Sequence, residues 1–281
     1  MNKIPLAEMI DKAVDWLQLH FGDALDAFSD TFGNIIGALG DFLAFIPWWI
    51  IILIFVALAW KAKGWKLALG TAIGLLLIYN LTLWSSFLNT LVLVIISALV
   101  SIIIGLPLGI IGGRNSRFYQ IISPILDFMQ TMPSFVYLIP ALLFFGIGKV
   151  PAVFATVIFA MPPAIRFTAL GIRQVPKELV EVGEAFGCTP KQLLWKIQMP
   201  LAIPTIMAGI NQTMMLSLSM VVIAAMIGAG GLGAGVLEAI GQLKIGMGFE
   251  YGVAVVIMAI ILDRLFQAIG SSLRTDEDSN K

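Results

Sequence analysis

EVGEAFGCTPKQLLWKIQMP, residues 181–200, is the one long charged and capped segment that lies between apolar runs of membrane-spanning length. Its first part favours a helix that stops at Gly187, since glycine tolerates the backbone conformation of a helix end. A T-x-x-Q capping box then begins at Thr189, and Pro190 suits the first position of a second helix that runs toward Met199. The stretch therefore predicts two short helices joined by a tight turn.

The first of these helices carries a stripe of carboxylates. Glu178, Glu181 and Glu184 follow one another at a spacing of three, which brings them to one face of a helix. The residues beside the stripe are small and would let another protein approach the backbone: Gly183, Ala185 and Gly187. Such a stripe is typical both of a docking surface for a basic partner and of a solvated cytoplasmic loop.

Five positions of the same stretch carry a family motif. Glu181, Gly187, Ile197, Met199 and Pro200 follow the spacing E-A-A-x-x-x-G-x9-I-x-L-P. The stretch therefore resembles the EAA loop of ABC importer permeases, although residues 182–183 replace the two alanines and Met199 replaces the leucine. Residues 201–233 resemble the glycine betaine and proline betaine permeases of the MetI-like type, and the likeness extends from about residue 89 to residue 270.

This resemblance implies a fold, a function and partners. The fold is an all-α integral membrane protein, a MetI-like type I ABC importer permease. The function is the transmembrane permease of an ATP-driven importer for glycine betaine or a related compatible solute, used in osmoprotection. The partners are a second copy in a homodimer, an ABC ATPase subunit, an extracytoplasmic substrate-binding protein and membrane lipid. The residues that would couple the chain to its ATPase are Glu181, Glu184, Ala185, Gly187, Ile197 and Pro200.

The composition independently indicates a membrane protein. Hydrophobic residues make up 59% of the 281 residues and charged residues 12%, and the mean hydropathy is +0.96, whereas charged residues are about 25% of a soluble domain. A net charge of zero argues against a nucleic-acid partner. The sequence has no Walker motif, no nucleophile beside a base and no metal-ligating cluster. We therefore expect no enzyme activity, cofactor or metal site in this chain.

A helix needs about 20 apolar residues to cross a bilayer. Seven runs approach that length: 46–61, 65–83, 87–111, 121–146, 150–171, 201–227 and 250–270. The first two are the shortest, so residues 46–86 are interpreted as two accessory helices. The permease core is then 87–271, with the coupling loop at 172–200.

The two ends of the chain are polar or amphipathic. Residues 1–45 place acids between apolar residues at helical spacing, which predicts an amphipathic helical segment broken near Gly22 and Gly33. This segment could pack on the outer face of the protein or lie on lipid. Residues 272–281 form a polar tail that we expect to be disordered.

Lysine and arginine near the span ends set the expected orientation. They gather between spans one and two, three and four, and five and six, and after span seven, all of which fall on one side. We therefore expect a multi-pass protein of the cytoplasmic membrane with its N-terminus outside. The coupling loop and the C-terminus would lie in the cytoplasm.

Ionisable residues within the spans need a partner or water. Asp127, Arg166, Asp263 and Arg264 all fall near the cytoplasmic ends of their spans, and an unpaired charge there costs at least a few kcal/mol. One explanation is that these side chains reach the headgroups. The other is that Asp127 or Asp263 pairs with Arg166 across neighbouring spans and holds a cytoplasmic gate.

Span six carries methionines and serines that could line a pore. Met214, Ser217 and Met220 are the candidates, because a flexible, polarizable lining could pass a small zwitterion without holding it tightly. Methionines at helical spacing are equally typical of ordinary packing.

Other functions and substrates stay open at this point. An ion-coupled secondary carrier for a small zwitterion, or a membrane scaffold without a pore, would also be apolar and multi-spanning. Choline, carnitine and proline betaine are substrates close to glycine betaine. Trp48, Trp49 and Trp84 lie near the expected outer interface, where they indicate an aromatic belt rather than a cage for a quaternary ammonium.

Overall fold

The structure, a computed structural model, describes residues 6–278, and every regular element in that range is a helix. A bilayer offers no water to backbone N–H and C=O groups, so a spanning chain forms helices, which satisfy them internally. Within the described range, four helices are long and apolar enough to cross a membrane: α4 (Trp84–Arg114), α7 (Lys149–Arg173), the continuous helix Pro190–Ile227 and the first part of α12 (Ile245–Asp278). Two bent helix pairs raise the number of candidate spans to as many as six. The predicted all-α membrane fold is confirmed, and the seven expected spans are roughly consistent with this number.

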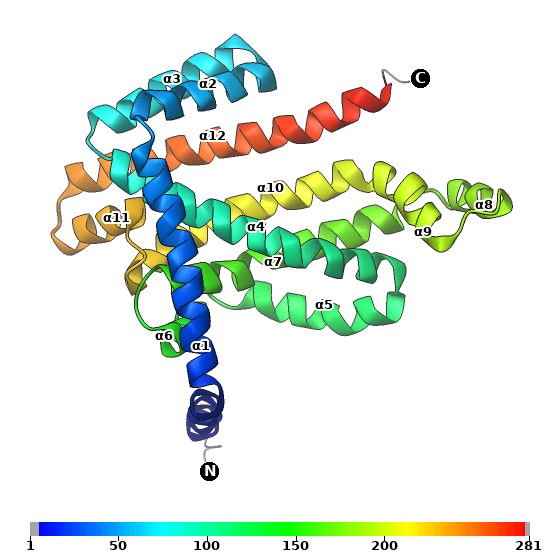
Figure 1. Cartoon of the computed structure of the whole chain (residues 1–281), viewed down its shortest axis with the longest axis horizontal. Coiled ribbons are helices and arrows are strands. Elements are labelled where there is room, and N and C mark those ends of the chain that lie inside the picture. The colour runs from blue at the N-terminus through cyan, green and yellow to red at the C-terminus, as the bar shows by residue number, and fades with distance from the viewer. Residues whose placement is uncertain (1–5, 279–281) are drawn as a thin grey trace.

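Helices α4 and α7 lie side by side (Figure 1). Three α4 glycines, each four residues from the next, pack on three α7 residues at the same spacing: Gly105 on Ala164, Gly109 on Thr168 and Gly113 on Ile172. A Cβ atom added at Gly109 would lie 2.5 Å from Cβ of Thr168 and 2.8 Å from the Ile165 carbonyl oxygen. Small residues at a spacing of four permit this approach of two backbones.

Helix α10 (Met199–Ile223) packs on another side of α7, again through glycines. A Cβ added at Gly171 of α7 would lie 3.1 Å from the Ala202 carbonyl oxygen, and one at Gly209 of α10 would lie 2.5 Å from Cβ of Phe167. Helix α7 is therefore held between α4 and α10, and the three helices form the centre of the molecule.

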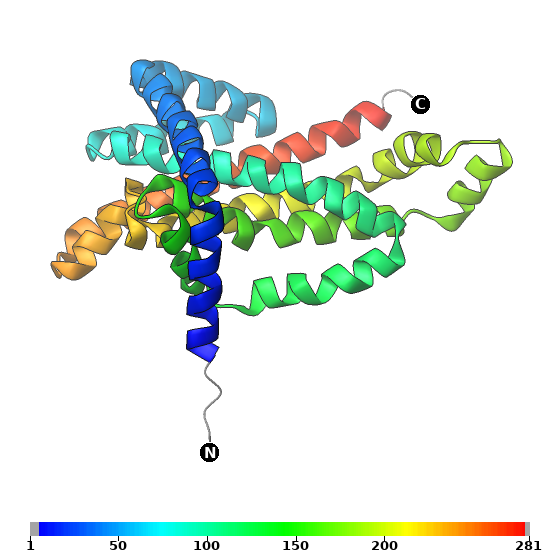
Figure 2. The ribbon, with the colours of Figure 1, turned by 60° about the horizontal axis from the view of Figure 1, so that its bottom comes forward.

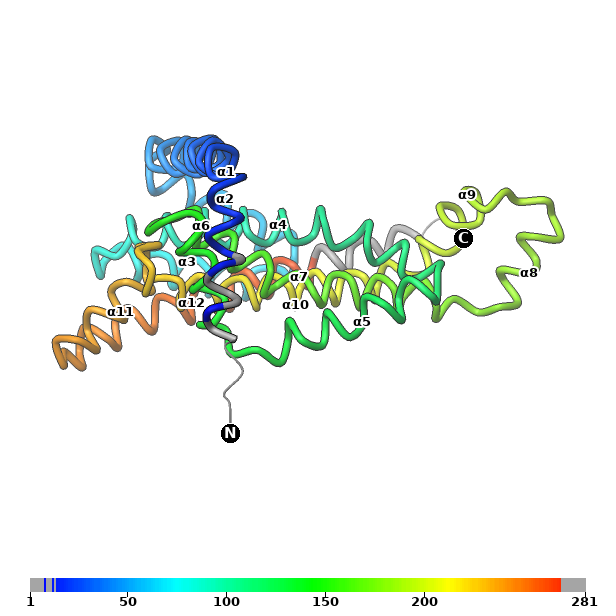
Figure 3. Tube along the Cα trace, turned by 90° about the horizontal axis from the view of Figure 1, so that it is seen from below, coloured from blue at the N-terminus to red at the C-terminus, as the bar shows by residue number. Residues whose placement is uncertain are grey.

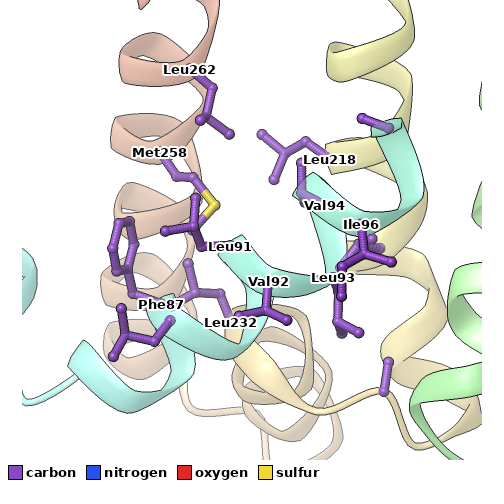
Figure 4. Packing of buried hydrophobic residues seen from close by; sticks show 14 of the residues in the cluster. Phe87, Leu91, Val92, Leu93, Val94, Ile96, Leu218, Leu232, Met258 and Leu262 are labelled. Atoms are coloured by element: carbon purple, nitrogen blue, oxygen red, sulfur yellow. The ribbon is translucent and has the colours of Figure 1, made fainter. Parts of the chain in front are cut away.

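The apolar core lies at the end of this centre where α4 begins. Figure 4 shows α4 side chains, among them Phe87 and Leu91, packed toward Leu218 of α10, Leu232 of α11 and Met258 of α12. Helix α11 (Gly231–Gly241) is fixed to the same end, because the hydroxyl of Thr90 accepts a hydrogen bond of 2.8 Å from the backbone N–H of Leu232. At this end of the molecule, α4, α10, α11 and α12 therefore pack into one apolar core.

The N-terminal helix α1 (Leu6–Phe45) runs across the spans at this end (Figures 1 and 2). It packs against α4, α6 and α7, and the amide of Gln18 donates a hydrogen bond of 2.8 Å to the Leu143 carbonyl. The predicted breaks near Gly22 and Gly33 are wrong, since the helix runs without interruption through both. Packing requires glycine at neither position, because a Cβ at Gly33 would be in ordinary contact with Val150 at 3.5 Å and one at Gly22 would have no neighbour within 4 Å.

The accessory helices α2 (Trp48–Lys63) and α3 (Trp65–Asn80) form a hairpin that packs on α12. Gly64 turns the chain between them with a φ of 81°. A Cβ at Gly74 of α3 would lie 2.7 Å from Ile257 of α12. The hairpin therefore covers α12 rather than the central α4–α7 pair.

The run 121–146, expected as a single span, is broken. Its parts are α5 (Ser116–Thr131), η1 (Ser134–Tyr137) and α6 (Leu138–Phe145), and the chain bends by 106° at the break. Proline disfavours the helical conformation of the residue before it, and Met132, before Pro133, adopts an extended ψ of 135°. Figure 2 shows α5 standing apart from the other long helices between its two ends.

The C-terminal tail also differs from expectation. Helix α12 continues to Asp278, so most of the segment expected to be disordered is helical. Residues 279–281 lie outside the described range.

The α4–α7 packing leads to a test of stability. We expect Gly109→Ala to destabilise the fold by about 1–3 kcal/mol, because overpacking forces neighbouring atoms apart, here Thr168 and the Ile165 carbonyl. Gly70→Ala is the matched control, since nothing lies within 4 Å of a Cβ added there. It should not destabilise the fold, because alanine is about 1 kcal/mol more favourable than glycine in a helix interior. Thermal unfolding in detergent measures both variants. Equal midpoints for the two would contradict the close-packing account.

Candidate functional site

The coupling loop, residues 172–200, projects from one end of the molecule as two short helices (Figure 3). These are α8 (Lys177–Ala185) and α9 (Pro190–Leu193). Gly187 lies between them with a φ of 75°, and the predicted capping box of Thr189 and Gln192 is present. The two predicted helices and their turn are confirmed.

The second loop helix does not end where the sequence suggested. From α9 the chain continues through a π-helical turn, η2 (Leu194–Gln198), directly into α10. Pro200 accounts for the wide turn, because it has no N–H to donate and its ring would crowd the carbonyl of Lys196 in a regular α-helix. The second loop helix and the span are therefore one helix, Pro190–Ile227.

The loop helices pack on each other through Gly183. A Cβ at this position would lie 2.6 Å from Ile197 and 2.8 Å from Leu193, and Gly183 is buried. The expectation that Gly183 leaves room for a partner protein is corrected, because the room is filled by the second loop helix. Ile197 contributes to this internal contact, whereas Ala185 and Gly187 are exposed.

Large apolar side chains of the loop face outward. Phe186 is 86% exposed, Trp195 56% and Val182 52%, and the helices α8 and α9 lie at the projecting end of the molecule (Figure 3). Exposed apolar groups gathered on a polar segment mark protein interaction sites. Sequence reasoning concentrated on the carboxylates and missed Phe186 and Trp195, although large apolar residues in a charged loop were the available signal.

The carboxylates Glu181 and Glu184 line a cleft of about 370 Å³ between the loop and the ends of the spans. The cleft also contains the basic residues Arg173 and Lys177 and the amide of Gln198. The stripe therefore faces, at least in part, the protein's own basic groups.

Arg173, at the end of α7, fastens the loop to the neighbouring helices. Its guanidinium donates a hydrogen bond of 2.6 Å to the Gly112 carbonyl of α4. The same group lies 4.2 Å from the ring centroid of Tyr119 in α5, a cation–π contact. Arg173 therefore links the loop end of α7 to both α4 and α5.

The intramembrane charges form two polar groups. Arg166 of α7 donates a hydrogen bond to the Asp127 carboxylate of α5 and forms an ion pair with it. Asp263 of α12 instead accepts hydrogen bonds from the amides of Asn211 (3.0 Å) and Gln267 (2.7 Å). Of the two partners considered for Arg166, the structure therefore pairs it with Asp127.

The methionines and serine expected to line a pore are buried within the chain. Met214, Ser217 and Met220 all lie in the packed interior, and the Ser217 hydroxyl donates to the Thr213 carbonyl at 2.8 Å. The structure therefore places all three in the interior of a single copy, and their role in lining a pore stays a prediction. The exposed polar residues of the same span are Gln212 and Ser219.

Comparison with known proteins identifies the family. Residues 105–275 match the model of the family described as binding-protein-dependent transport system inner membrane component. The glycine betaine transport system permease protein OpuAB of Bacillus subtilis is 52% identical, over 96% of this chain and 95% of that protein. The glycine betaine/carnitine permease GbuB of Listeria monocytogenes is 51% identical over 97% and 98%, and the glycine betaine/proline betaine permease ProW of Escherichia coli 47% over 97% and 77%.

The fold agrees with that of a solved transporter. An inward-facing structure of the MetNI methionine ABC transporter superposes with a TM-score of 0.60 at 22% identity, over 68% of this chain and 95% of the matched chain. At that identity the likeness concerns the fold alone.

Three findings support the same family. They are a projecting two-helix loop that continues into a span, a helical centre packed through glycines, and near full-length identity to named permeases. The chain belongs to the family of binding-protein-dependent transport system inner membrane components, the permease subunits of ABC importers.

Proposed function

We propose that this permease serves an importer of glycine betaine or a closely related compatible solute. The observation that carries the proposal is the near full-length identity, 47–52%, to three permeases named for glycine betaine transport. Carnitine is the first alternative, because one of those relatives is also named for it. Hydrolysis of ATP would take place on a separate ATPase subunit, and an external binding protein would deliver the substrate.

The coupling loop is proposed as the docking element for the ATPase. Phe186 and Trp195 would supply apolar contact on its outer surface, and the exposed Glu181 and Glu184 would add polar contact. Ala185, Gly187, Ile197 and Pro200 would shape the loop rather than carry charge. Because the second loop helix is continuous with α10, its displacement would move that span as a rigid body.

The translocation path is proposed to lie between two copies of the chain. Gln212 and Ser219 are exposed polar residues on α10, and such residues face a water-filled path more readily than lipid. The Asp127–Arg166 pair, which joins α5 to α7 on the coupling-loop half of the molecule, would hold the inner gate. In this arrangement residues 87–271 form the permease core, and the 46–86 hairpin lies outside it.

The proposed orientation follows from the loop. An ATPase that uses cellular ATP lies in the cytoplasm, so the coupling loop and the C-terminus would face the cytoplasm. The crossing helix α1 and the N-terminus would then lie at the outer surface.

The first prediction concerns the substrate. Proteoliposomes containing the permease, its ATPase and its binding protein should take up radiolabelled glycine betaine when ATP is enclosed, with unlabelled carnitine and choline as competitors. The permease alone should give no uptake, because it would lack the energy source. Uptake by the chain alone, driven by an ion gradient, would contradict the proposal and favour a secondary carrier.

The second prediction concerns docking. Phe186→Ser should reduce the amount of ATPase that co-purifies with the permease at least about tenfold, since buried aromatic anchors carry much of the energy of an interface. Phe42→Ser is the matched control, because that phenylalanine is also exposed but lies on α1. Equal recovery of ATPase with the two variants would argue against the loop as the docking surface.

The third prediction concerns the gate. Arg166→Gln and Asp127→Asn should each reduce transport at least about tenfold in the assembled importer, because each leaves an unpaired charge in the membrane region. The exchanged variant Arg166→Asp with Asp127→Arg should recover part of the transport. If both single variants transport substrate and hydrolyse ATP at the wild-type rates, the ion pair does not hold a gate.

A further inference from the structure

A second feature lies at the opposite end of the molecule from the coupling loop. It is a cavity of about 530 Å³ where the end of α1, the start of α2 and the starts of α4 and α7 meet. Its volume falls within the range of about 300–1,000 Å³ that is usual for small-molecule sites. Neither the coupling mechanism nor the proposed path between two copies uses this cavity.

The cavity is lined by one charge of each sign. Asp41 comes from α1 and Lys149 from the first residue of α7. Neither side chain takes part in the two ion pairs found within the described part of the chain. A carboxylate and an ammonium that share a cavity without pairing can each receive an opposite charge from a ligand.

Aromatic rings form the apolar part of the wall. Trp48 and Trp84 both line the cavity. Trp48 stacks on Tyr79 with ring centroids 4.2 Å apart, and Trp84 stacks on Phe87 at 5.3 Å. The two indoles are thus held in place before any ligand arrives, and indole faces are the best aromatic partners for alkylated ammonium groups.

A third tryptophan shows that these two differ from belt residues. Trp49 is next to Trp48 in the sequence, yet it does not line the cavity and is 50% exposed. Trp49 therefore fits the expected aromatic belt, whereas Trp48 and Trp84 belong to the wall of a charged cavity.

We propose that this cavity is a binding site for a small zwitterion that carries an alkylated ammonium and a carboxylate. The ammonium lies against Trp48 and Trp84 near Asp41, and the carboxylate pairs with Lys149. Ser85 and Asn89 supply hydrogen-bonding groups on the same wall. The chemistry of the wall is independent of the proposed function, but the choice of glycine betaine as the natural ligand rests on it.

The site is connected to the turn that follows α10. Asn89, on the cavity wall, donates a hydrogen bond of 3.0 Å to the Ala229 carbonyl. Ala229 lies in the turn between η3 (Ala224–Ile227) and α11, which follows α10. A ligand that contacts Asn89 would therefore be linked to the turn that follows α10.

The test uses the full-length chain in nanodiscs of phosphatidylethanolamine and phosphatidylglycerol, whose headgroups carry no quaternary ammonium. Ligand-observed saturation-transfer NMR gives Kd values for glycine betaine, tetramethylammonium and acetate, with no binding protein present. We expect saturable binding of glycine betaine in the millimolar range, and weaker binding of the two probes that carry only one of its charges.

Two charge-neutralising variants separate the ends of the ligand. Asp41→Asn should raise the Kd of both glycine betaine and tetramethylammonium about fivefold, the scale of one exposed charge or cation–π contact. Lys149→Gln should raise the Kd of glycine betaine and leave that of tetramethylammonium unchanged. Both side chains are exposed, so neither change threatens the fold.

The tryptophans provide the matched pair. Trp48→Leu should raise the Kd of both ammonium ligands, and Trp49→Leu should change neither. No saturable binding in the wild type, or the same Kd in Asp41→Asn, Lys149→Gln and Trp48→Leu as in the wild type, would overturn the site.

Two comparisons remove the remaining alternatives. In phosphatidylcholine nanodiscs an unchanged Kd supports a free solute as the ligand, and a tenfold higher Kd overturns that assignment in favour of a lipid headgroup. Uptake by the assembled importer is measured separately. Binding without glycine betaine uptake contradicts the proposed function and supports the site, whereas uptake by the importer with no binding to this chain overturns the site.

Discussion

The close contact of α4 with α7 is the constraint on which the rest of the molecule depends. Lipid tails are as apolar as leucine, so helices in a bilayer gain little from burying apolar surface and depend on tight van der Waals packing. The glycines of α4 provide that packing by allowing the backbone of α4 to lie directly on α7. Helix α10 is seated on α7 by the same means at Gly171 and Gly209. Both ends of the molecule, the coupling loop and the cavity beside α1, are attached to this one rigid group.

Local chemistry was sufficient to predict the parts of the site that are themselves local. Thr189 and Gln192 lie three residues apart and make their own capping box, so the start of α9 needed no tertiary information. The packing partner of Gly183 was not predictable in this way. It depends on how the second loop helix folds back, which brings Leu193 and Ile197 onto Gly183. The composition also predicted the membrane class without tertiary information, because it depends on which residues are present and not on where they lie in the fold.

Proline and glycine were ambiguous within the spans. Pro133 breaks a predicted span, whereas Pro162 and Pro163 lie inside an uninterrupted α7. Pro124 likewise lies inside α5 without breaking it, so the presence of a proline alone does not show where a span ends. Met214 and Met220 likewise could not be assigned to pore or core from helical spacing alone, which marks a face but not what lies against it.

The unbroken helix that joins the loop to α10 has a consequence for the membrane surface. Residues 190–200 precede the apolar run 201–227 in the same helix, and at 1.5 Å per residue they lengthen it by about 16 Å. The headgroup layer on each side of a bilayer is only about 5–8 Å thick. With α10 close to the bilayer normal, the tip of the loop would stand clear of the lipid. A protein docked there would touch water on its other sides, and the salt of the surrounding solution would reach its contact with the loop directly.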